Sequence, residues 1–485
     1  METSGILEAL LKKTEWQTFD CKRALTKPAK LLETVVAFAN SGGGIIALGL
    51  EDPEKAVDAK RLIGIKEGLD NVSEFLKLYQ KEIDPLVSVK KYEIEIKNQN
   101  HEEDHILIIS VDKSNDIHSL KNGDTFIRNG RQNTKIGSSE IIRLKYEKGV
   151  IKYENEITKI DDLDCIDKDL LEKFKTDTGS HTQDTWQSLK DNGLVLRNGE
   201  KYYLTKGGIL LFGKNPAITL GSKCSIKISH YVGKRSLFTG EPNLAAKPIS
   251  IEGPLYFQIN KAVDYFRNLV RSSPPKLSGG TFKPTFLIPQ WVFQEAIANA
   301  VIHRDYSIQN DIHVRFFDDR VEVESPGTYP GHVTVENIRQ ERFARNPLIL
   351  RTLNRFSESP NLDHGEGVDR MFALMKAENL YEPIYIPPEV RRYSVLVMLL
   401  NLHRVEYWDT VSQYLDKNIF VTNRTAKKIT GIADTLKMSK LLRKWTKQGL
   451  LQKTGEKKNT KYSKSVGVKT TLSLLSLGVD NKNET

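Results

Sequence analysis

One predicted helix places a carboxylate and an amide where they could act together. Residues 295–307 read EAIANAVIHRDYS, and helical spacing puts Glu295 and Asn299 one turn apart on the same face. The alanines around them suit close packing against another helix. Alone, this pair is also what a solvated helix face would show, so its meaning depends on what surrounds it.

Two later segments supply a turn and a glycine loop. Residues 316–327 read FFDDRVEVESPG, which predicts a strand that ends in a turn at Pro326-Gly327. Residues 364–370 read HGEGVDR, and Gly365 and Gly367 would let a loop approach a phosphate closely. Together with the helix pair, these segments indicate a nucleotide site.

The order of these parts resembles a divergent branch of the GHKL ATPases, in which the helix ends in His-Arg-Asp-Tyr. The resemblance implies that Asn299 is a magnesium ligand, that Glu295 is a base for the attacking water and that the glycines form a lid. The residues it assigns to binding ATP with Mg²⁺ are Asn299, His303, Arg304, Asp305, Pro326, Gly327, Gly365 and Gly367. The usual Asp-x-Gly that reads adenine is Ser325-Pro326-Gly327 here, so nucleotide binding is implied more strongly than adenine recognition or hydrolysis.

Acidic residues near the N-terminus form a second candidate site. Glu15, Asp20 and Lys22 lie close in sequence, and Asp52 follows the predicted strand at residues 45–50. Three converging carboxylates could bind a divalent metal, Mg²⁺ or Mn²⁺. A metal-bound water beside Lys22 would suit phosphodiester cleavage.

This segment resembles the Schlafen-type AlbA-like domain. The resemblance is carried by Glu15, by Phe19-Asp20-Cys21-Lys22, by the helix sequence AFAN with two glycines at residues 37–43, and by Phe126-Ile127-Arg128. Some members cleave RNA with three acids, which the resemblance places at Glu15, Asp20 and Asp52. Others act only as nucleic-acid-binding or regulatory domains. Asp20 is a departure, because it replaces a glutamate and is shorter by one methylene.

The basic charge of the chain is concentrated in one region. The net charge is +10, yet residues 411–470 alone hold 15 Lys and Arg against 3 Asp and Glu. This region therefore carries the whole basic excess, which indicates binding to a polyanion.

The same region resembles a winged helix-turn-helix. We expect helices at residues 406–418, 422–431 and 432–451, the last with Leu436, Leu441, Leu442 and Trp445 available to its core, and then a hairpin with a lysine-rich tip. The predicted nucleic-acid contacts are Lys437, Lys440, Arg443, Lys444, Lys447, Lys457 and Lys458. A lysine-dominated set predicts contacts with the phosphate backbone more than with bases. A dimerisation or interdomain module is the alternative.

We expect a multidomain α+β chain. The predicted parts are an AlbA-like α/β domain at 1–140, a small winged-helix-like segment at 160–216, a GHKL-type α/β sandwich at 217–403, a winged helix at 404–465 and a tail at 466–485. The stretch GILLFGKN at residues 208–215 is a poor phosphate-binding loop, and we expect a buried strand there.

Composition narrows the cellular setting. Three separated cysteines fit a reducing cytoplasm, and no apolar run approaches the length of a membrane span. The favoured function is an ATP-binding, nucleotide-responsive DNA-binding transcriptional regulator, with DNA or RNA as partner and a homo-oligomer as the assembly. The alternative is a metal-dependent Schlafen-like nuclease gated by ATP, with antiviral defence as its setting. A third reading is an ATP-binding assembly protein.

Overall fold

The computed structural model describes most of the 485-residue chain. The described residues are 7, 10–11, 15–237, 240–274, 276–278, 281–283, 286–360, 365–386, 393–404, 407–447, 450–455 and 460–464. Within them the fold is mixed α+β, with a four-stranded sheet, a six-stranded sheet and several two-stranded sheets. No helix in this part of the chain is both long and apolar enough to span a bilayer.

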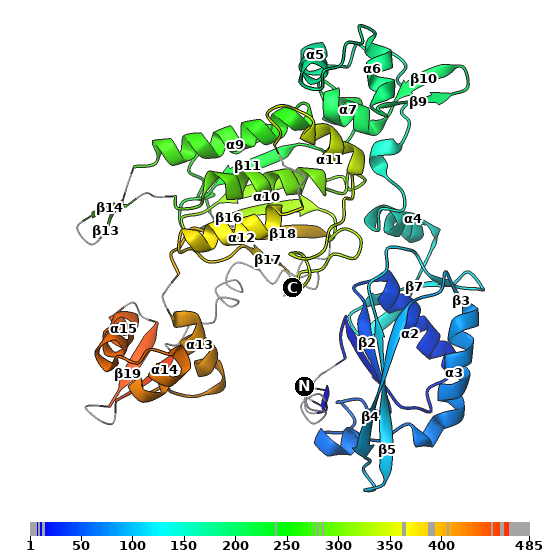
Figure 1. Ribbon diagram of the computed structural model, residues 1–485, viewed down its shortest axis with the longest axis vertical. Coiled ribbons are helices and arrows are strands. Elements are labelled where there is room, and N and C mark those ends of the chain that lie inside the picture. Colours follow the sequence, from blue (N-terminus) through cyan, green and yellow to red (C-terminus); the bar gives the residue numbers. More distant parts are fainter. Residues whose placement is uncertain are drawn as a thin grey trace.

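The N-terminal unit, residues 15–148, is built on the four-stranded sheet (Figure 1). Its strand order is β1-β2-β5-β4, with β1 parallel to β2 and the other pairs antiparallel. Two helices pack on one face, and the opposite face has its own apolar layer. The main elements are β1 (Phe19–Lys22), α2 (Pro28–Asn40), β2 (Gly44–Leu48), α3 (Leu69–Glu82), β4 (Val89–Lys97) and β5 (Glu103–Val111).

Helix α2 forms where the sequence predicted it. Pro28 opens it, because proline fits the first turn of a helix, and nearly all of its second half is buried. The chain turns at Gly43, whose φ is +78°, and a Cβ there would lie 2.8 Å from the backbone of Val111 and Lys113. Only glycine fits that conformation and that approach. The turn thereby holds the end of α2 against the end of β5.

Shorter elements complete the N-terminal unit. Gly130, with a φ of +60°, lies in the turn of the β7–β8 hairpin, where Asn129 pairs with Gln132. These elements are η1 (Asp58–Arg61), η2 (Lys66–Gly68), β3 (Ile83–Asp84), β6 (Ser119–Leu120), β7 (Thr125–Asn129), β8 (Gln132–Ile136) and α4 (Ser138–Glu147).

A small helical segment follows, with a two-stranded hairpin. Its elements are η3 (Tyr153–Asn155), α5 (Lys168–Asp177), α6 (Thr185–Asp191), β9 (Val195–Asn198), β10 (Lys201–Leu204), α7 (Lys206–Phe212) and α8 (Pro216–Thr219). The strand expected at residues 208–212 was wrong, because this stretch lies in helix α7. The side chain of Thr205 accepts a hydrogen bond from Gly208 N and caps the helix, an N-terminal signal that the apolar run concealed.

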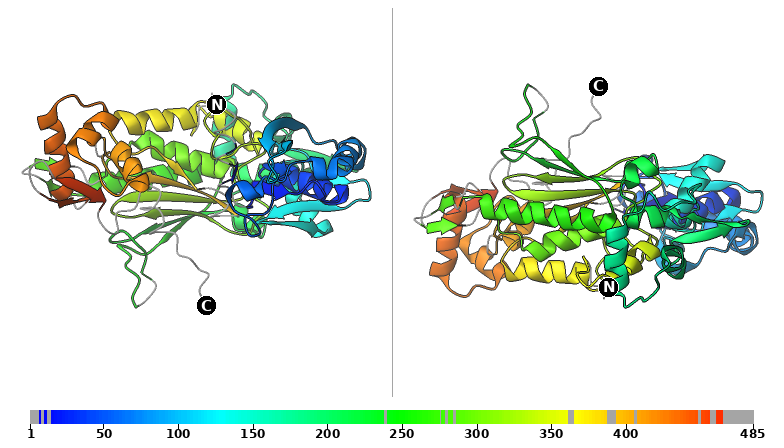
Figure 2. Two further views of the ribbon diagram at one scale, coloured as in Figure 1. Left: turned by 90° about the horizontal axis from the view of Figure 1, so that it is seen from below. Right: turned by 90° about the horizontal axis from the view of Figure 1, so that it is seen from above.

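The largest sheet has strand order β12-β11-β15-β16-β18-β17. Helices α9, α10 and α12 lie together on one face of it (Figure 2). The elements are β11 (Ile226–His230), β12 (Ile249–Ile251), α9 (Leu255–Ser272), β13 (Lys276–Ser278), β14 (Thr281–Lys283), α10 (Gln290–Ile302), β15 (Ile312–Phe316), β16 (Arg320–Pro326), α11 (Pro347–Asn354), α12 (Gly367–Ala377), β17 (Ile384–Tyr385) and β18 (Ser394–Leu400). A single apolar core runs from this sheet into the preceding helical segment.

The C-terminal unit, residues 407–464, has three helices and a hairpin around its own core. Its elements are α13 (Trp408–Lys417), α14 (Asn423–Thr430), α15 (Thr435–Lys447), β19 (Leu451–Thr454) and β20 (Lys461–Lys464). Leu442 and Trp445 are buried as expected, but Leu436 is 72% exposed. Met438 takes the inner position instead, since it lies one turn before Leu442.

A buried glutamate joins the helical segment to the large sheet. Glu154 is fully buried, and its two carboxylate oxygens accept hydrogen bonds from Leu348 N and Ile349 N in the first turn of α11. Burial raises the pKa of Glu154, and the two N–H donors oppose that shift. The carboxylate thus caps a helix that lies almost 200 residues further along the chain.

We predict that Glu154→Ala destabilises this core. The substitution leaves two N–H groups of α11 without an acceptor, which costs roughly 1–3 kcal/mol. Differential scanning calorimetry should show a lower Tm for the transition of the core, whereas Glu200→Ala, at an exposed position in the same segment, should change little. Equal transitions for the two variants would contradict the prediction.

Candidate functional site

A cavity of about 570 Å³ lies beside α10. It is lined by α10, β16, β18, the first turn of α12 and the segment 328–344. We call this last segment, residues 328–344, the cavity wall. The lining is largely apolar, with a few polar groups, a combination typical of small-molecule sites. The predicted site residues that line it are Glu295, Asn299, His303, Pro326, Gly365 and Gly367.

The predicted helix is confirmed as far as Ile302, whereas residues 303–307 form the turn that follows it, and its polar pair faces the cavity. Asn299 Nδ2 donates to Glu295 Oε1 at 3.0 Å, as expected for residues one helical turn apart. Glu295 is only 8% exposed. Burial raises its pKa, and the Asn299 hydrogen bond and the Arg370 charge oppose the rise. The carboxylate is therefore a buried proton acceptor that few neighbours stabilise.

Gly367 brings Glu295 to the start of α12. A Cβ at Gly367 would lie 1.8 Å from Glu295 Oε1, so any side chain there would displace the carboxylate. Gly365 has a φ of +66° and lies against Arg342. The two predicted glycines therefore permit close approaches around the cavity, one to a carboxylate and the other to a guanidinium.

Three predicted binding residues are not among those that line the cavity. Arg304 donates to the carbonyls of residues 223, 308 and 310. Asp305 forms an ion pair with Arg345 at 3.2 Å, with both side chains nearly fully buried. Gly327 has a φ of +119° and packs against Asp305. These contacts fix the turn after α10.

The end of α10 is shaped by two side chains. Asn346 Nδ2 donates to the carbonyls of Ile302 and Arg304, at 2.8 Å each, and the following Pro347 opens α11. Asn346 therefore satisfies the last carbonyls of one helix at the point where the next begins. His303 lines the cavity, and its Nδ1 has no hydrogen-bond partner among the described residues. Burial lowers the pKa of His303 to about 4, so the imidazole is neutral at pH 7.

Sequence reasoning missed the cations of the cavity. Arg342 and Arg370 both line it, and the Arg370 guanidinium lies 4.8 Å from the centre of the Trp291 ring. Arg370 sits one helical turn after Gly367, so the spacing in GVDR could have indicated that both face one site. No comparable pattern in the sequence points to Arg342.

Ser325 stands where the resemblance to GHKL ATPases would have an adenine-binding aspartate, and its side chain makes a different contact. Ser325 Oγ donates to Ala300 O at 2.6 Å, which ties β16 to α10. Glu341 is the carboxylate that lines the cavity from its wall, and His332 Nε2 lies 2.9 Å from its Oε2. Recognition of a base by a carboxylate would therefore involve a different residue from the usual one.

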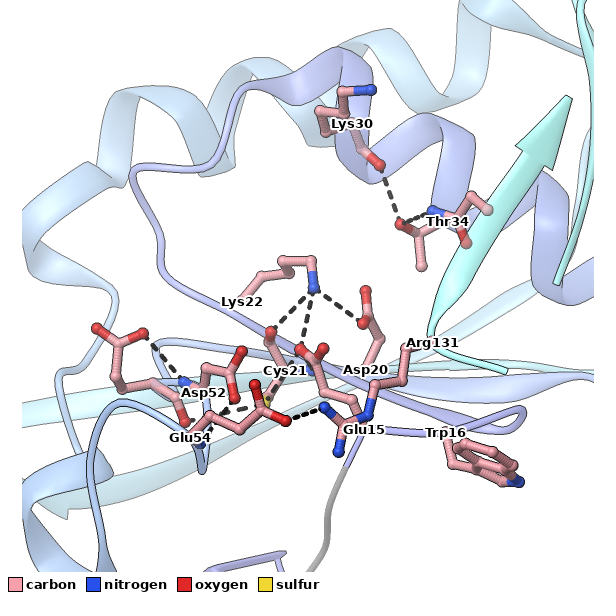
Figure 3. Close-up of polar contacts among 12 residues, drawn as sticks. Glu15, Trp16, Asp20, Cys21, Lys22, Lys30, Thr34, Asp52, Glu54 and Arg131 are labelled. Atoms are coloured by element: carbon pink, nitrogen blue, oxygen red, sulfur yellow. Dashed lines mark hydrogen bonds and ion pairs between the residues drawn. The ribbon is translucent and has the colours of Figure 1, made fainter. Parts of the chain in front are cut away.

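At the N-terminal site a lysine lies between two of the predicted acids. Lys22 Nζ donates to Glu15 Oε1 at 3.0 Å and to Asp20 Oδ1 at 2.9 Å (Figure 3). Burial lowers the pKa of Lys22, but the contacts with Asp20 and Glu15 raise this pKa by more than burial lowers it. The net shift is upward, so the ammonium stays charged. A fixed positive charge thus stands where a metal would have to meet both acids.

Arg128 also holds Asp20, at the same Oδ1 that Lys22 contacts. The two form a buried ion pair at 3.1 Å, and Arg128 also contacts Trp16 O and Asn133 Oδ1. Asp20 Oδ2 has no hydrogen-bond partner in the part of the chain that the structure describes. Asp20 therefore links strand β1 to the β7–β8 hairpin.

The third predicted acid has a local partner. Asp52 Oδ1 accepts a hydrogen bond from Glu54 N at 2.9 Å, and Figure 3 shows the two side by side. Within the described residues no group of three or more His, Cys, Asp or Glu side chains is arranged to hold a metal ion. Glu15 and Asp20 thus meet Lys22 while Asp52 meets a backbone N–H, and a metal site at these three acids stays a prediction.

The basic surface of the C-terminal unit is formed by helix α15. Lys437, Lys440, Arg443 and Lys444 are exposed, while Met438, Leu442 and Trp445 point into the core. Helix α15 ends at Lys447, whose side chain lies outside the description, as do Lys457 and Lys458. The described part of the face has four cations within eight residues.

We predict that Gly367→Ala destabilises the protein through Glu295. The new methyl group would overlap the buried carboxylate, which costs roughly 1–3 kcal/mol. In a Glu295→Ala background the same change should cost almost nothing, because the overlapping atoms are gone. Denaturant unfolding of the two single variants and the double variant measures this coupling, and additive effects would count against it.

Comparisons with known proteins match two parts of the chain. Residues 15–137 match the family described as "Schlafen, AlbA_2", and residues 309–398 match that described as "Putative ATP-dependent DNA helicase recG C-terminal". No curated protein matches. The DIP2311 protein from Corynebacterium diphtheriae is a similar crystal structure, with 18% identity over 93% of this chain and 92% of that chain, and a TM-score of 0.40. The two family matches indicate nucleic-acid binding and ATP binding.

Proposed function

We propose that this protein is an ATP-binding regulator that binds nucleic acid in response to nucleotide. The observation that carries the proposal is the cavity, which brings Glu295 and Asn299 together with Gly365 and Gly367 from a segment about 70 residues away. The resemblance to divergent GHKL ATPases and the recG-like match both support ATP as the ligand.

The cavity suits the phosphates of a nucleotide. Arg342 and Arg370 offer positive charge, and Gly365 lets the Arg342 guanidinium lie against the backbone of the glycine loop. Asn299 would hold the magnesium ion that accompanies ATP, through an amide oxygen of the type Mg²⁺ accepts. When bound, the ion would supply charge neutralisation for the phosphates. Glu295 is placed to accept a proton from a water molecule, since burial has raised its pKa.

The cavity also has surface that suits a base. Trp291, Tyr329 and Tyr385 supply aromatic surface, and Glu341 supplies a carboxylate. Since Ser325 is already engaged with Ala300, we propose that the base is held mainly by apolar contact. Adenine and guanine nucleotides should therefore be discriminated only weakly.

We predict that Asn299→Ala abolishes binding of ATP with magnesium while the fold is retained. The substitution removes the amide but leaves α10 intact, because alanine favours a helix. Isothermal titration calorimetry with ATP and Mg²⁺ measures the loss, and GTP in parallel measures base selectivity. Asn268→Ala, at an exposed position on α9, is the matched control. Unchanged affinity in Asn299→Ala would overturn the site.

Nucleic-acid binding is proposed for both ends of the chain. The Schlafen AlbA_2 match supports it for the N-terminal unit. In the C-terminal unit, α14 and α15 followed by the β19–β20 hairpin have the order of a winged helix-turn-helix, with α15 as the helix that enters a groove. Its exposed lysines suit phosphates, so most of the affinity should depend on salt.

The N-terminal contacts favour binding over cleavage. Lys22 joins Glu15 to Asp20, and Arg128 contacts the same oxygen of Asp20 that Lys22 does. Both acids therefore form ion pairs with neighbouring side chains. We infer that they stabilise the surface of the N-terminal unit and do not bind a catalytic metal ion. Regulation without cleavage is the function we favour.

We predict that the double variant Lys440→Ala, Lys444→Ala weakens nucleic-acid binding and lowers its salt dependence. The slope of log K against log salt concentration should fall by about 2, roughly one unit per lost phosphate contact. Fluorescence anisotropy with duplex DNA and with tRNA measures this, and Lys168→Ala with Lys247→Ala is the control pair of exposed lysines elsewhere.

If the salt dependence of binding is the same in the double variant and the wild type, α15 does not contact the nucleic acid. The same samples, incubated with Mg²⁺ or Mn²⁺, also test the nuclease alternative. If the wild type cuts the nucleic acid and Asp52→Ala does not, the protein is a nuclease and the proposal of a regulator is wrong. Intact substrate under all conditions supports the regulator.

A further inference from the structure

The cavity wall is an irregular segment. Residues 328–344 join β16 to α11 and contain no helix or strand. Local side chains shape parts of it, since Thr334 N donates to Asn337 Oδ1 and Asn337 Nδ2 donates to His332 O. A segment without regular backbone hydrogen bonds depends on neighbouring elements for a defined position.

Those neighbours include the N-terminal unit. Lys113 Nζ donates to Tyr329 O at 2.9 Å and to Val333 O at 3.3 Å, and both acceptor residues line the cavity. Asn115 Nδ2 lies 3.3 Å from His332 Nδ1 in the same stretch. One lysine therefore bridges two carbonyls of the wall from more than 200 residues away.

The far end of the wall meets the N-terminal unit as well. A Cβ at Gly149 would lie 3.2 Å from the Phe343 ring, so this ring packs against the backbone just after α4. Arg345 NH1 lies 3.5 Å from Tyr146 O in α4. The wall is thus held near both of its ends by groups outside its own sheet.

The loop that carries Lys113 is itself clamped. Lys148 Nζ donates to Ser114 O at 2.6 Å, to Asp116 O at 2.8 Å and to Ala39 O at 3.0 Å. Ala39 lies at the end of α2. Lys148 therefore fixes the Lys113 loop to this helix.

The same helix end reaches the acidic cluster. Ser41 follows α2, and its Oγ accepts a hydrogen bond from Arg128 N at 2.8 Å. Arg128 in turn pairs with the buried Asp20. Hydrogen bonds joined by short stretches of backbone therefore connect the cavity wall to Asp20, by way of Lys113, Lys148 and Arg128.

We propose that Lys113 is a positioning residue for the nucleotide cavity, through which the N-terminal unit sets the wall and senses its occupant. The role in nucleotide binding rests on the function proposed above, whereas the positioning of the wall does not. A ligand that moves Tyr329 or Val333 would change the contacts of Lys113 and, through Lys148, those of the α2 end.

The charge state of Lys113 gives the contact a pH dependence. Burial lowers the pKa of Lys113 to about 8, with Glu147 opposing the shift and Arg345 adding to it. Burial and the Lys113 charge lower the pKa of Lys148 to about 7, opposed by Glu147 and Asp116. A free lysine titrates near pH 10.4. Between these two pKa values, Lys113 loses a proton when it contacts the cavity wall. The contact between Lys113 and the wall therefore becomes stronger as the pH rises from 8 toward 10.

The first experiment measures the wall without nucleotide. Hydrogen exchange of residues 328–344 is compared in wild type, Lys113→Met, Lys113→Arg and the control Lys91→Met, which changes an exposed lysine of β4. Lys113→Met keeps the chain length but removes the donors, so exchange should speed up roughly tenfold or more. Lys113→Arg should restore part of the protection. Wild-type exchange in Lys113→Met would overturn the proposal.

The second experiment measures the consequence for the nucleotide. Titration calorimetry with ATP and Mg²⁺ between pH 7.5 and 9.5 should show affinity rising with pH in wild type, and a flatter profile in Lys113→Arg, because arginine does not titrate there. Equal profiles would overturn the sensing role. If the wild type binds no nucleotide, the proposed function fails, and faster exchange in Lys113→Met alone then supports the positioning of the wall.

Discussion

The close approach of Glu295 to Gly367 is the contact on which the cavity depends. Two helices, α10 and α12, can meet at that point only because residue 367 has no side chain. The buried carboxylate then lies at the start of α12, one helical turn from Asn299 and near Arg370. Asn299 and Arg370 are the polar groups grouped around this contact, whereas Glu341 and Ser325 have partners of their own.

Buried ion pairs and caps serve a different purpose elsewhere in the molecule. Asp305 with Arg345, Asp20 with Arg128, and Glu154 at the start of α11 each join segments far apart in sequence. Such groups are costly to bury without partners, so each one specifies a single arrangement of the elements it connects. The HRDY motif illustrates this, because two of its four residues hold the turn after α10 and do not line the cavity.

Through Lys113, the N-terminal unit contacts the cavity wall and can affect the shape of the cavity. Its wall lacks regular structure and is held from outside by Lys113, while the opposite side of the cavity rests on a rigid helix and sheet. A ligand can move the less constrained side with little loss of packing elsewhere. Nucleotide and nucleic acid would then influence each other through one lysine and the loop that Lys148 clamps.

Local sequence patterns determined the elements of this protein. The period of the residues around Glu295, and the AFAN sequence followed by two glycines, indicated helices where α10 and α2 occur, because such signals act over a few neighbouring residues. Residues 208–212 were misread as a strand because a short buried run has the same pattern in a helix. The tertiary structure alone placed Lys22 between Glu15 and Asp20, brought Arg342 to the cavity and set Lys113 against its wall. These contacts join segments far apart in the chain, and their partners are chosen by packing and charge balance, which no local pattern encodes.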